Sequence, residues 1–198
     1  MACVYPGKSC ERMNLRRLAK TGFNRWIGLV EVSAEPYRTH VPVLIQLAQL
    51  LKPRRIAEFG MGHFSTSIFL DRVCFPLVER LTSFEDDSEW FAVIAKKHSQ
   101  DLRFEPNLVP GPMWKTAVKL RASDYDLVLV DDSKTECDRA KTLLALRVAQ
   151  RITKGPVVVV HDAELPRVRV ATLVFPNRMY FYDLCPQTGV LCWKRRRS

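Results

Sequence analysis

The stretch that most constrains this chain is a short apolar run that passes through an acidic residue into a glycine-rich turn. The run covers residues 55–59, with Glu58 inside it, and Gly60 and Gly62 form the turn. Glycine allows the backbone to approach a ligand closely, and the N–H groups that begin the next helix attract anionic or polar ligand atoms. A second apolar run ends at Glu85. Because a carboxylate one strand–helix unit later can accept hydrogen bonds from both hydroxyls of a ribose, these features predict a nucleotide-like cofactor.

Strand-like and helix-like patterns alternate along the rest of the chain. Residues 125–131 and 157–162 are almost wholly apolar, which is typical of strands buried on both faces of a parallel sheet. Further strands are expected at 81–85 and, more weakly, at 102–104, ahead of a proline- and glycine-rich loop at 106–112. Helical spacing and capping residues predict helices over 41–51, 65–73 (capped by Ser65 or Thr66), 89–97 (capped by Ser88), 113–120 and 137–152. The alternation predicts an α/β fold with a doubly wound, mostly parallel sheet.

The two ends of the chain differ from its middle. Segments 179–184 and 190–194 lie on either side of a turn and predict a C-terminal antiparallel hairpin. Residues 1–36 show no sustained periodicity of apolar residues, so we interpret them as an N-terminal arm in front of a single domain, residues 37–198. The arm is long enough to cover the site of a neighbouring copy, which leaves a homodimer open.

Composition narrows the class of protein. The chain is 47% hydrophobic and 26% charged, as in ordinary soluble globular domains. It has no apolar run near the roughly 20 residues that cross a bilayer, and its first ten residues lack the apolar core of a secretion signal. Its six cysteines form no Cys-x-x-Cys pair and are interpreted as reduced thiols. We therefore expect a cytoplasmic protein without a membrane partner.

The charge of the chain is unbalanced. Thirty-one basic and 21 acidic residues give a formal net charge of +10, and basic residues gather at both ends, for example at 194–197. Such a balance favours contact with polyanions, so a nucleic-acid partner stays open beside the simpler interpretation of a solubilising tail.

Polar residues occur at the carboxyl ends of four of the expected strands. Because the carboxyl ends of parallel strands share one rim of a sheet, these residues are expected to converge on a common site. They are Glu58 to Gly62, Glu85, Asp131 to Lys134, and the pair His161 and Asp162.

This ordered set resembles the class I S-adenosylmethionine-dependent methyltransferases over roughly residues 37–198. The resemblance is carried by Glu58-Phe59-Gly60-Met61-Gly62, by Glu85, by Val130-Asp131 and by the late hairpin. It implies a Rossmann-like methyltransferase fold. A dinucleotide-binding Rossmann enzyme is the nearest alternative, but that fingerprint has a third glycine where Ser65 stands.

The resemblance also implies a binding site for S-adenosylmethionine. Gly60 and Gly62 would pass beneath the cofactor, Glu85 would hold its ribose, and Met113 or Trp114 would stack on its adenine. The implied cofactor-binding residues are Glu58, Gly60, Gly62, His63, Ser65, Glu85, Asp86, Met113, Trp114 and Asp131. Two simpler interpretations stay open: Glu58 as an ion-pair partner of Arg54 or Arg55, and Trp114 as a core aromatic.

A narrower resemblance is to the catechol-type, metal-dependent O-methyltransferases. It is carried by Asp131-Asp132-Ser133-Lys134 and by Asp162-Ala163. In that family two aspartates and an asparagine hold a divalent cation and the lysine is the general base. The resemblance therefore implies Asp131 and Asp162 as ligands of Mg²⁺, but Ala163 stands in place of the third ligand. A site without metal stays open, and there His161 is the preferred base because it titrates near neutral pH.

The favoured function is methyl transfer from S-adenosylmethionine to a small hydroxyl- or amine-bearing acceptor, with Asp131, Lys134 and His161 as catalytic candidates. One alternative is an RNA methyltransferase, although the tetrad that serves a base amine is absent after Asp131. The other alternative is a non-catalytic binding module with the same fold.

Overall fold

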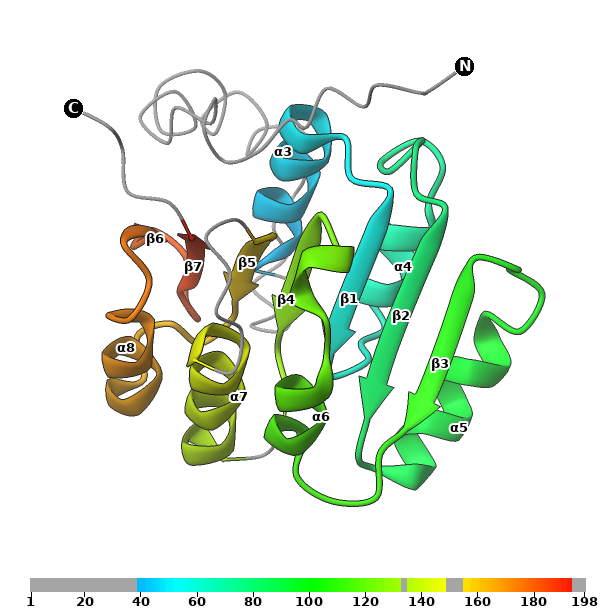
Figure 1. Cartoon of the computed structure of the whole chain (residues 1–198). Coiled ribbons are helices and arrows are strands. Elements are labelled where there is room, and N and C mark those ends of the chain that lie inside the picture. The colour runs from blue at the N-terminus through cyan, green and yellow to red at the C-terminus, as the bar shows by residue number, and fades with distance from the viewer. Residues whose placement is uncertain (1–38, 133–134, 149–154, 194–198) are drawn as a thin grey trace, which may run out of the picture.

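The computed structural model describes residues 39–132, 135–148 and 155–193. Seven strands form one sheet in the order β3-β2-β1-β4-β5-β7-β6 (Figure 1). The strands are β1 (Arg55–Phe59), β2 (Arg80–Glu85), β3 (Phe104–Leu108), β4 (Leu127–Val130), β5 (Val157–Val160), β6 (Asn177–Phe181) and β7 (Thr188–Cys192). Strands β1 to β5 are parallel, whereas β7 runs antiparallel to both β5 and β6. The predicted doubly wound sheet and its C-terminal hairpin are confirmed.

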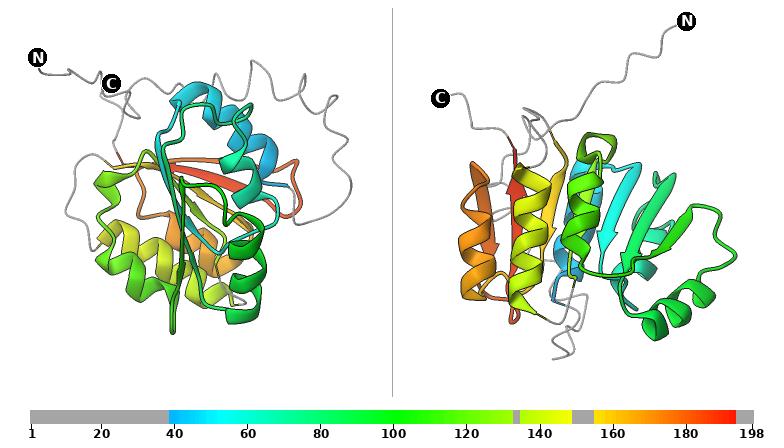
Figure 2. Two further views of the ribbon diagram at one scale, coloured as in Figure 1. Left: turned by 90° about the vertical axis from the view of Figure 1, so that its right-hand side faces the viewer. Right: turned by 60° about the horizontal axis from the view of Figure 1, so that its bottom comes forward.

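Helices cover both faces of this sheet, as Figure 2 shows in its edge-on view. They are α3 (Val41–Leu51), α4 (Ser65–Leu70), α5 (Ser88–Lys97), α6 (Met113–Lys119), the 3₁₀ turn η3 (Ala122–Asp124), α7 (Glu136–Val148) and α8 (Pro166–Thr172). Helices α3, α4 and α5 pack on one face, and α6, α7 and α8 pack on the other.

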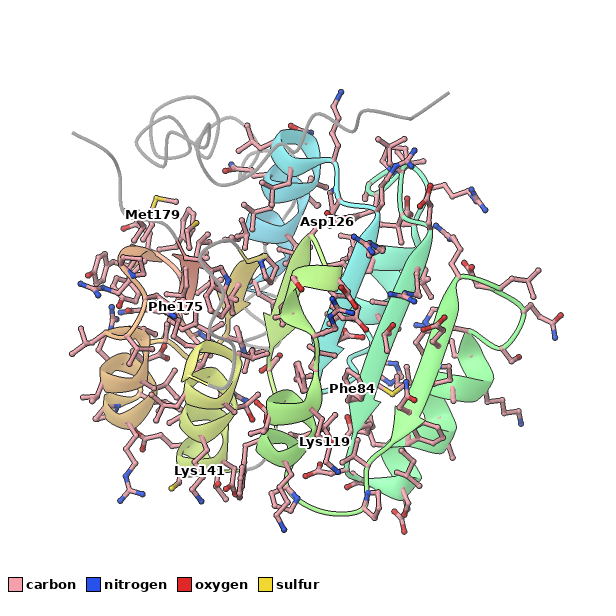
Figure 3. The ribbon with its side chains drawn as sticks, in the orientation of Figure 1. Phe84, Lys119, Asp126, Lys141, Phe175 and Met179 are labelled. Carbon is pink, nitrogen blue, oxygen red and sulfur yellow. The ribbon has the colours of Figure 1, made fainter. Side chains whose placement is uncertain are left out.

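The alternation of side chains along the central strands explains the two layers. In β4, Leu127 and Leu129 belong to one buried cluster, while Val128 and Val130 belong to the other. Each such side chain contributes about 1.5–3 kcal/mol when it is fully buried, so both faces need a covering layer of helices. Figure 3 shows the side chains that these elements carry, among them Lys141 of α7, which is exposed.

Several boundaries differ from those predicted. Helix α4 ends at Leu70 rather than near residue 73, and neither Ser65 nor Thr66 caps it. Asp87, rather than Ser88, caps α5, because its carboxylate accepts hydrogen bonds from two backbone N–H groups of the first turn. The serine and threonine hydroxyls of α4 are used instead beneath the glycine turn, as described below.

The weak strand expected at 102–104 lies later in the chain: β3 covers Phe104–Leu108 and runs through Pro106, which was expected in the loop. Proline is tolerated there because β3 lies at the edge of the sheet, where one side of the strand forms no ladder. Helix α8 was not predicted, since its seven residues are too short for a clear helical period. The interpretation of all six cysteines as thiols is wrong for Cys192, which is disulfide-bonded, whereas Cys74, Cys137 and Cys185 are free.

Residues 1–36 lie outside the described ranges, so the division into an arm and a domain stays a prediction. Within the described ranges, no helix combines the length and apolar character that crossing a bilayer requires.

Candidate functional site

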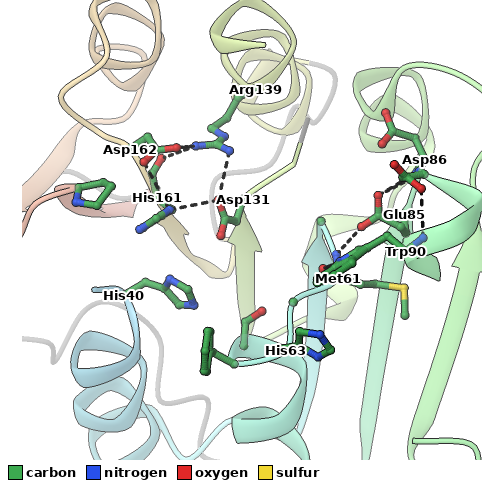
Figure 4. A pocket seen from close by; sticks show the side chains of 16 residues that line it. His40, Met61, His63, Glu85, Asp86, Trp90, Asp131, Arg139, His161 and Asp162 are labelled. Carbon is green, nitrogen blue, oxygen red and sulfur yellow. Dashed lines mark hydrogen bonds and ion pairs between the residues drawn. The ribbon is translucent and has the colours of Figure 1, made fainter. Parts of the chain in front are cut away.

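The carboxyl ends of β1, β2, β4 and β5 surround a cavity of about 720 Å³, which is drawn in Figure 4. This volume lies within the usual range of small-molecule sites. The cavity brings together most residues that the sequence singled out, namely Gly60, Gly62, His63, Ser65, Glu85, Asp86, Asp131, His161 and Asp162. The predicted convergence of the strand ends on one rim is therefore what the structure shows.

Gly60 is required where the turn leaves β1. Its φ of +87° is a conformation that side chains disfavour, and a Cβ atom there would lie 2.3 Å from the carbonyl oxygen of Asp131. At Gly62 a Cβ atom would instead meet the hydroxyl of Ser65, at 2.6 Å. The first glycine is thus fixed by the close approach of the β4 backbone, while both glycines form part of the cavity wall.

Glu58 lies beneath the turn and does not reach the cavity. Its Oε2 accepts hydrogen bonds from the hydroxyls of Thr66 at 2.8 Å and Ser83 at 2.6 Å, and the Thr66 hydroxyl accepts one from the N–H of Gly62. Complete burial raises the pKa of Glu58 to about 7, against the effect of these hydroxyls. Through these contacts Glu58 supports the loop from beneath. Among the described residues, Glu58 forms no ion pair with Arg54 or Arg55, and Arg54 pairs with Glu79.

Glu85 holds the middle of the turn. Its Oε2 accepts a hydrogen bond from Met61 N at 2.9 Å, and its Oε1 accepts two more from the next backbone N–H groups, those of Asp86 and Asp87. Burial raises the pKa of Glu85 despite these bonds. A carboxylate offers about four acceptor sites, so about one remains for a ligand hydroxyl rather than the two expected from the sequence.

Trp90 of α5 supports the same turn from the other side. Its indole N–H donates to the carbonyl oxygen of Met61 at 2.5 Å, and its ring packs edge-on against His63 at a centroid distance of 4.7 Å. Met61 is therefore held through both its N–H and its carbonyl group, which fixes the path of the turn before any ligand arrives.

Besides Glu58, two predicted cofactor-binding residues do not line the cavity. Met113 is 1% exposed and packs in the core beneath α6, and Trp114 packs against the same core. Neither lines the cavity, so the simpler interpretation of Trp114 as a core aromatic fits its position. Lys134, the catalytic candidate, lies outside the described residues.

Opposite the glycine turn, a charged cluster joins the ends of β4 and β5 (Figure 4). Arg139 of α7 reaches between two carboxylates: its Nη2 lies 3.1 Å from Oδ1 of Asp131, and its Nη1 donates to Oδ2 of Asp162. His161 Nδ1 also lies 3.2 Å from Oδ1 of Asp131. The side chains of Arg139 and His161 are only 8% and 5% exposed, so this cluster is a part of the wall rather than of the open surface.

The cluster shifts the protonation of its members. Burial alone would raise the pKa of Asp131, but the hydrogen bond from His161 and the nearby positive charges lower it to about 2. Burial lowers the pKa of His161, but the bond to Asp131 and the charges of Asp131 and Asp162 raise it above its ordinary value of 6.5. Asp131 is therefore ionised at neutral pH, and it favours the protonated form of His161.

His40, at the start of α3, was not predicted from the sequence. It is 2% exposed, it lines the cavity, and its ring packs edge-on against that of His161 at a centroid distance of 4.9 Å. Neither ring nitrogen has a hydrogen-bond partner among the residues that the structure describes. Burial lowers the pKa of His40 to about 4, so it is neutral. Arg139 and Trp90 were missed as well, because both lie on helices, away from the strand ends that the patterns marked.

Arg139 already engages one oxygen atom of each carboxylate expected to bind Mg²⁺, namely Oδ1 of Asp131 and Oδ2 of Asp162. Ala163 offers no ligand atom and is fully buried. A second group, His40, Asp131 and His161, has ligand atoms within 4.8 Å of one another, but imidazole is a ligand for transition metals rather than for Mg²⁺. The residues present therefore do not fit a magnesium ion.

The sequence matches no protein-family model and no curated protein. Solved structures do match. The O-methyltransferase TomG from Streptomyces achromogenes, in complex with SAM, is 17% identical with a TM-score of 0.57, over 81% of this chain and 88% of that one. An O-methyltransferase from Bacillus cereus, in complex with SAH, is 14% identical with a TM-score of 0.58, over 86% and 87%.

The N-methyltransferase NodS from Bradyrhizobium japonicum also matches, at 10% identity and a TM-score of 0.53, over 84% of this chain and 100% of that one. O- and N-methyltransferases thus share this architecture, and at such identities the likeness concerns the fold. Together with the strand order and the C-terminal hairpin, it shows that the chain has the Rossmann-like fold of the class I S-adenosylmethionine-dependent methyltransferases.

Proposed function

We propose that the protein transfers a methyl group from S-adenosylmethionine to a hydroxyl group of a small acceptor. The observation that carries the proposal is that one cavity places the glycine turn and Glu85 opposite the Asp131–His161 pair. A donor site and a proton-accepting site face the same space. Methyl transfer needs this arrangement, because the two reactants must be aligned and the acceptor must lose a proton.

On the donor side, the bound cofactor would supply a methyl group that is already activated on a sulfonium. The chain's own contribution is a preformed cradle. Met61 is fixed by Glu85 and Trp90, and Gly60 and Gly62 leave the wall free of side chains at this point. The remaining acceptor site of the Glu85 carboxylate suits a ribose hydroxyl.

On the acceptor side, His161 has the geometry of a general base. Its Nδ1 faces the carboxylate of Asp131, and its Nε2 lies 2.8 Å from the hydroxyl oxygen of Thr39. Nε2 is thus within hydrogen-bond reach of a hydroxyl, and an acceptor hydroxyl that takes this position would transfer its proton there. Asp131 stabilises the imidazolium that forms, which is the role of a carboxylate in an aspartate–histidine pair.

The choice of a hydroxyl over an amine acceptor rests on this pair. A neutral amine attacks a sulfonium methyl group without prior loss of a proton, whereas a hydroxyl needs a base. A histidine whose pKa is raised by an ionised aspartate is a stronger base than a free imidazole. The predicted nucleic-acid partner depends on the chain ends, which lie outside the described residues, so it stays a prediction, as do the homodimer and the cytoplasmic location.

Calorimetry with S-adenosylhomocysteine tests the donor site. We expect micromolar binding by the wild-type chain and at least about tenfold weaker binding by Glu85→Gln, since a hydrogen bond to a charged group contributes about 1.5–3 kcal/mol. Glu79→Gln is the matched control, because Glu79 is exposed and pairs with Arg54 away from the cavity. Absence of binding by the wild-type chain would refute the proposal.

A measurement of turnover distinguishes an enzyme from a non-catalytic binding module. Methyl transfer from labelled S-adenosylmethionine is measured against a panel of phenols, catechols and matching anilines, with mass spectrometry of the products. We expect products from hydroxyl acceptors, with at least about a hundredfold loss in His161→Gln. Tight cofactor binding without any product would instead support the non-catalytic alternative.

A further inference from the structure

We infer that Arg139 holds the place where the resemblance to catechol-type O-methyltransferases expects a divalent cation, and that the acceptor side of the cavity works without one. The inference rests on the proposed function, since it concerns how the same cavity handles its acceptor.

The guanidinium of Arg139 is fixed from three directions. It pairs with Asp131 and with Asp162, and its Nε donates to the carbonyl oxygen of Asp132 at 3.0 Å. The side chain is 8% exposed, so its charge acts on both carboxylates with little screening by water. A planar, permanently charged group matches carboxylate oxygens better than any other side chain does. Arg139 therefore balances the two aspartates that the sequence assigned to a metal.

A metal ion between these carboxylates would have to displace the arginine. Two positive centres at the same oxygen atoms repel each other, and the repulsion is strong where water is largely excluded. Magnesium also needs a nearly octahedral shell of oxygen ligands, to which the buried side chain of Ala163 contributes nothing. The ligand set of His40, Asp131 and His161 shares the carboxylate that Arg139 already binds.

This arrangement changes what the site requires of an acceptor. A chelated metal favours acceptors with two adjacent oxygen atoms, because both can bind the ion. With Arg139 in its place, one hydroxyl at Nε2 of His161 is sufficient. Arg139 acts as a positioning residue: it holds Asp131, and Asp131 in turn orients His161.

Thermal melts of the full chain, saturated with S-adenosylhomocysteine, test the inference with MgCl₂ as the probe. We expect no change in the Tm of the wild-type protein up to about 10 mM Mg²⁺, and no effect of EDTA on methyl transfer. Arg139→Ala uncovers two carboxylates, so Mg²⁺ is expected to raise its Tm by about 3 °C or more, since a cation that binds only the folded state stabilises it. Arg147→Ala is the matched control on α7, because Arg147 lies over Trp193 and away from the cavity.

Stabilisation of the wild-type protein by Mg²⁺ or Zn²⁺, or loss of turnover in EDTA, would overturn the inference. So would a folded Arg139→Ala protein that does not respond to Mg²⁺. If that variant does not fold, the wild-type titration still decides, because it needs no substitution. The proposed function is judged separately: loss of S-adenosylhomocysteine binding refutes it, whereas a metal response with intact binding refutes only the role given to Arg139.

Discussion

Replacement of Glu58 by glutamine should change how the stability of the protein depends on pH. Glu58 is completely buried, and its pKa is raised from 4.5 to about 7. The folded carboxyl group thus keeps its proton to a higher pH than the unfolded one. In this range the folded state binds more protons than the unfolded state, so stability falls as the pH rises from about 4.5 to about 7. At about 1.4 kcal/mol for each pH unit, the loss due to Glu58 is about 3 kcal/mol.

Glutamine removes this titration and keeps the shape of the side chain. Its carbonyl oxygen can still accept hydrogen bonds from Thr66 and Ser83, but its NH₂ group takes the place of Oε1, for which the described residues provide no hydrogen bond within normal distance. Glu58→Gln should therefore carry a constant loss of about 1–3 kcal/mol that does not depend on pH. Relative to the wild-type protein, the variant should gain about 3 kcal/mol between about pH 4 and about pH 8.

Urea denaturation followed by tryptophan fluorescence measures this difference at several pH values. Other buried acids, such as Asp132, also titrate in this range, but they are common to both proteins and cancel in the comparison. Glu79→Gln, at an exposed position, should follow the wild-type curve at a fixed offset. Parallel curves for Glu58→Gln and the wild-type protein would show that the pKa of this carboxyl group is the same in the folded and unfolded states, and the reasoning from burial would be wrong.

Three further outcomes are expected. Gly60→Ala should lower the free energy of unfolding by several kcal/mol or prevent folding, whereas Gly111→Ala, at a φ of +114° with open space around its Cβ, should lower it by about 1–2 kcal/mol. Equal losses of stability in urea denaturation would contradict the clash of Gly60→Ala with the main chain of Asp131. The rate of methyl transfer should rise with pH as His161 loses its proton, and Asp131 raises the pKa at which this happens. Asp131→Asn should therefore shift the rise in rate to lower pH and reduce the maximal rate by at least about tenfold. A pH–rate profile in which the rise is not shifted would exclude His161 as the base. Trp90→Phe should weaken S-adenosylhomocysteine binding about two- to tenfold in calorimetry without changing the rate at saturation, and a fall in that rate alone would contradict a role limited to the turn.

The strand pattern could be predicted from the sequence because the central strands are apolar on both faces and their ends carry the polar residues. β1, for example, has the predicted bounds. The capping of α4 and α5 could not be predicted correctly, since serine, threonine and aspartate compete for the same role and tertiary contacts decide between them. Thr66 is drawn to Glu58 and Gly62 instead, and Asp87 takes the cap of α5.

Part of the candidate site could likewise be predicted from the sequence, and part could not. Gly60 and Asp131 directly follow strands and Glu85 ends one, and their convergence is a consequence of the parallel sheet. Arg139 and His40 come from helices, where an arginine or a histidine is common on any surface, and no spacing in the sequence links them to the rim. Only the packing of α7 and α3 against the sheet brings their charge and their ring nitrogens to the cavity.

The contact between Gly60 and the main chain of Asp131 has a consequence for how such a protein can evolve. The turn that would cradle the methyl donor and the strand end that carries the carboxylate of Asp131 touch directly, with no side chain between them. A shift of either segment moves the other, so the two halves of the proposed site must change together. Acceptor preference can then diverge only through parts of the cavity wall away from this contact, such as the start of α3.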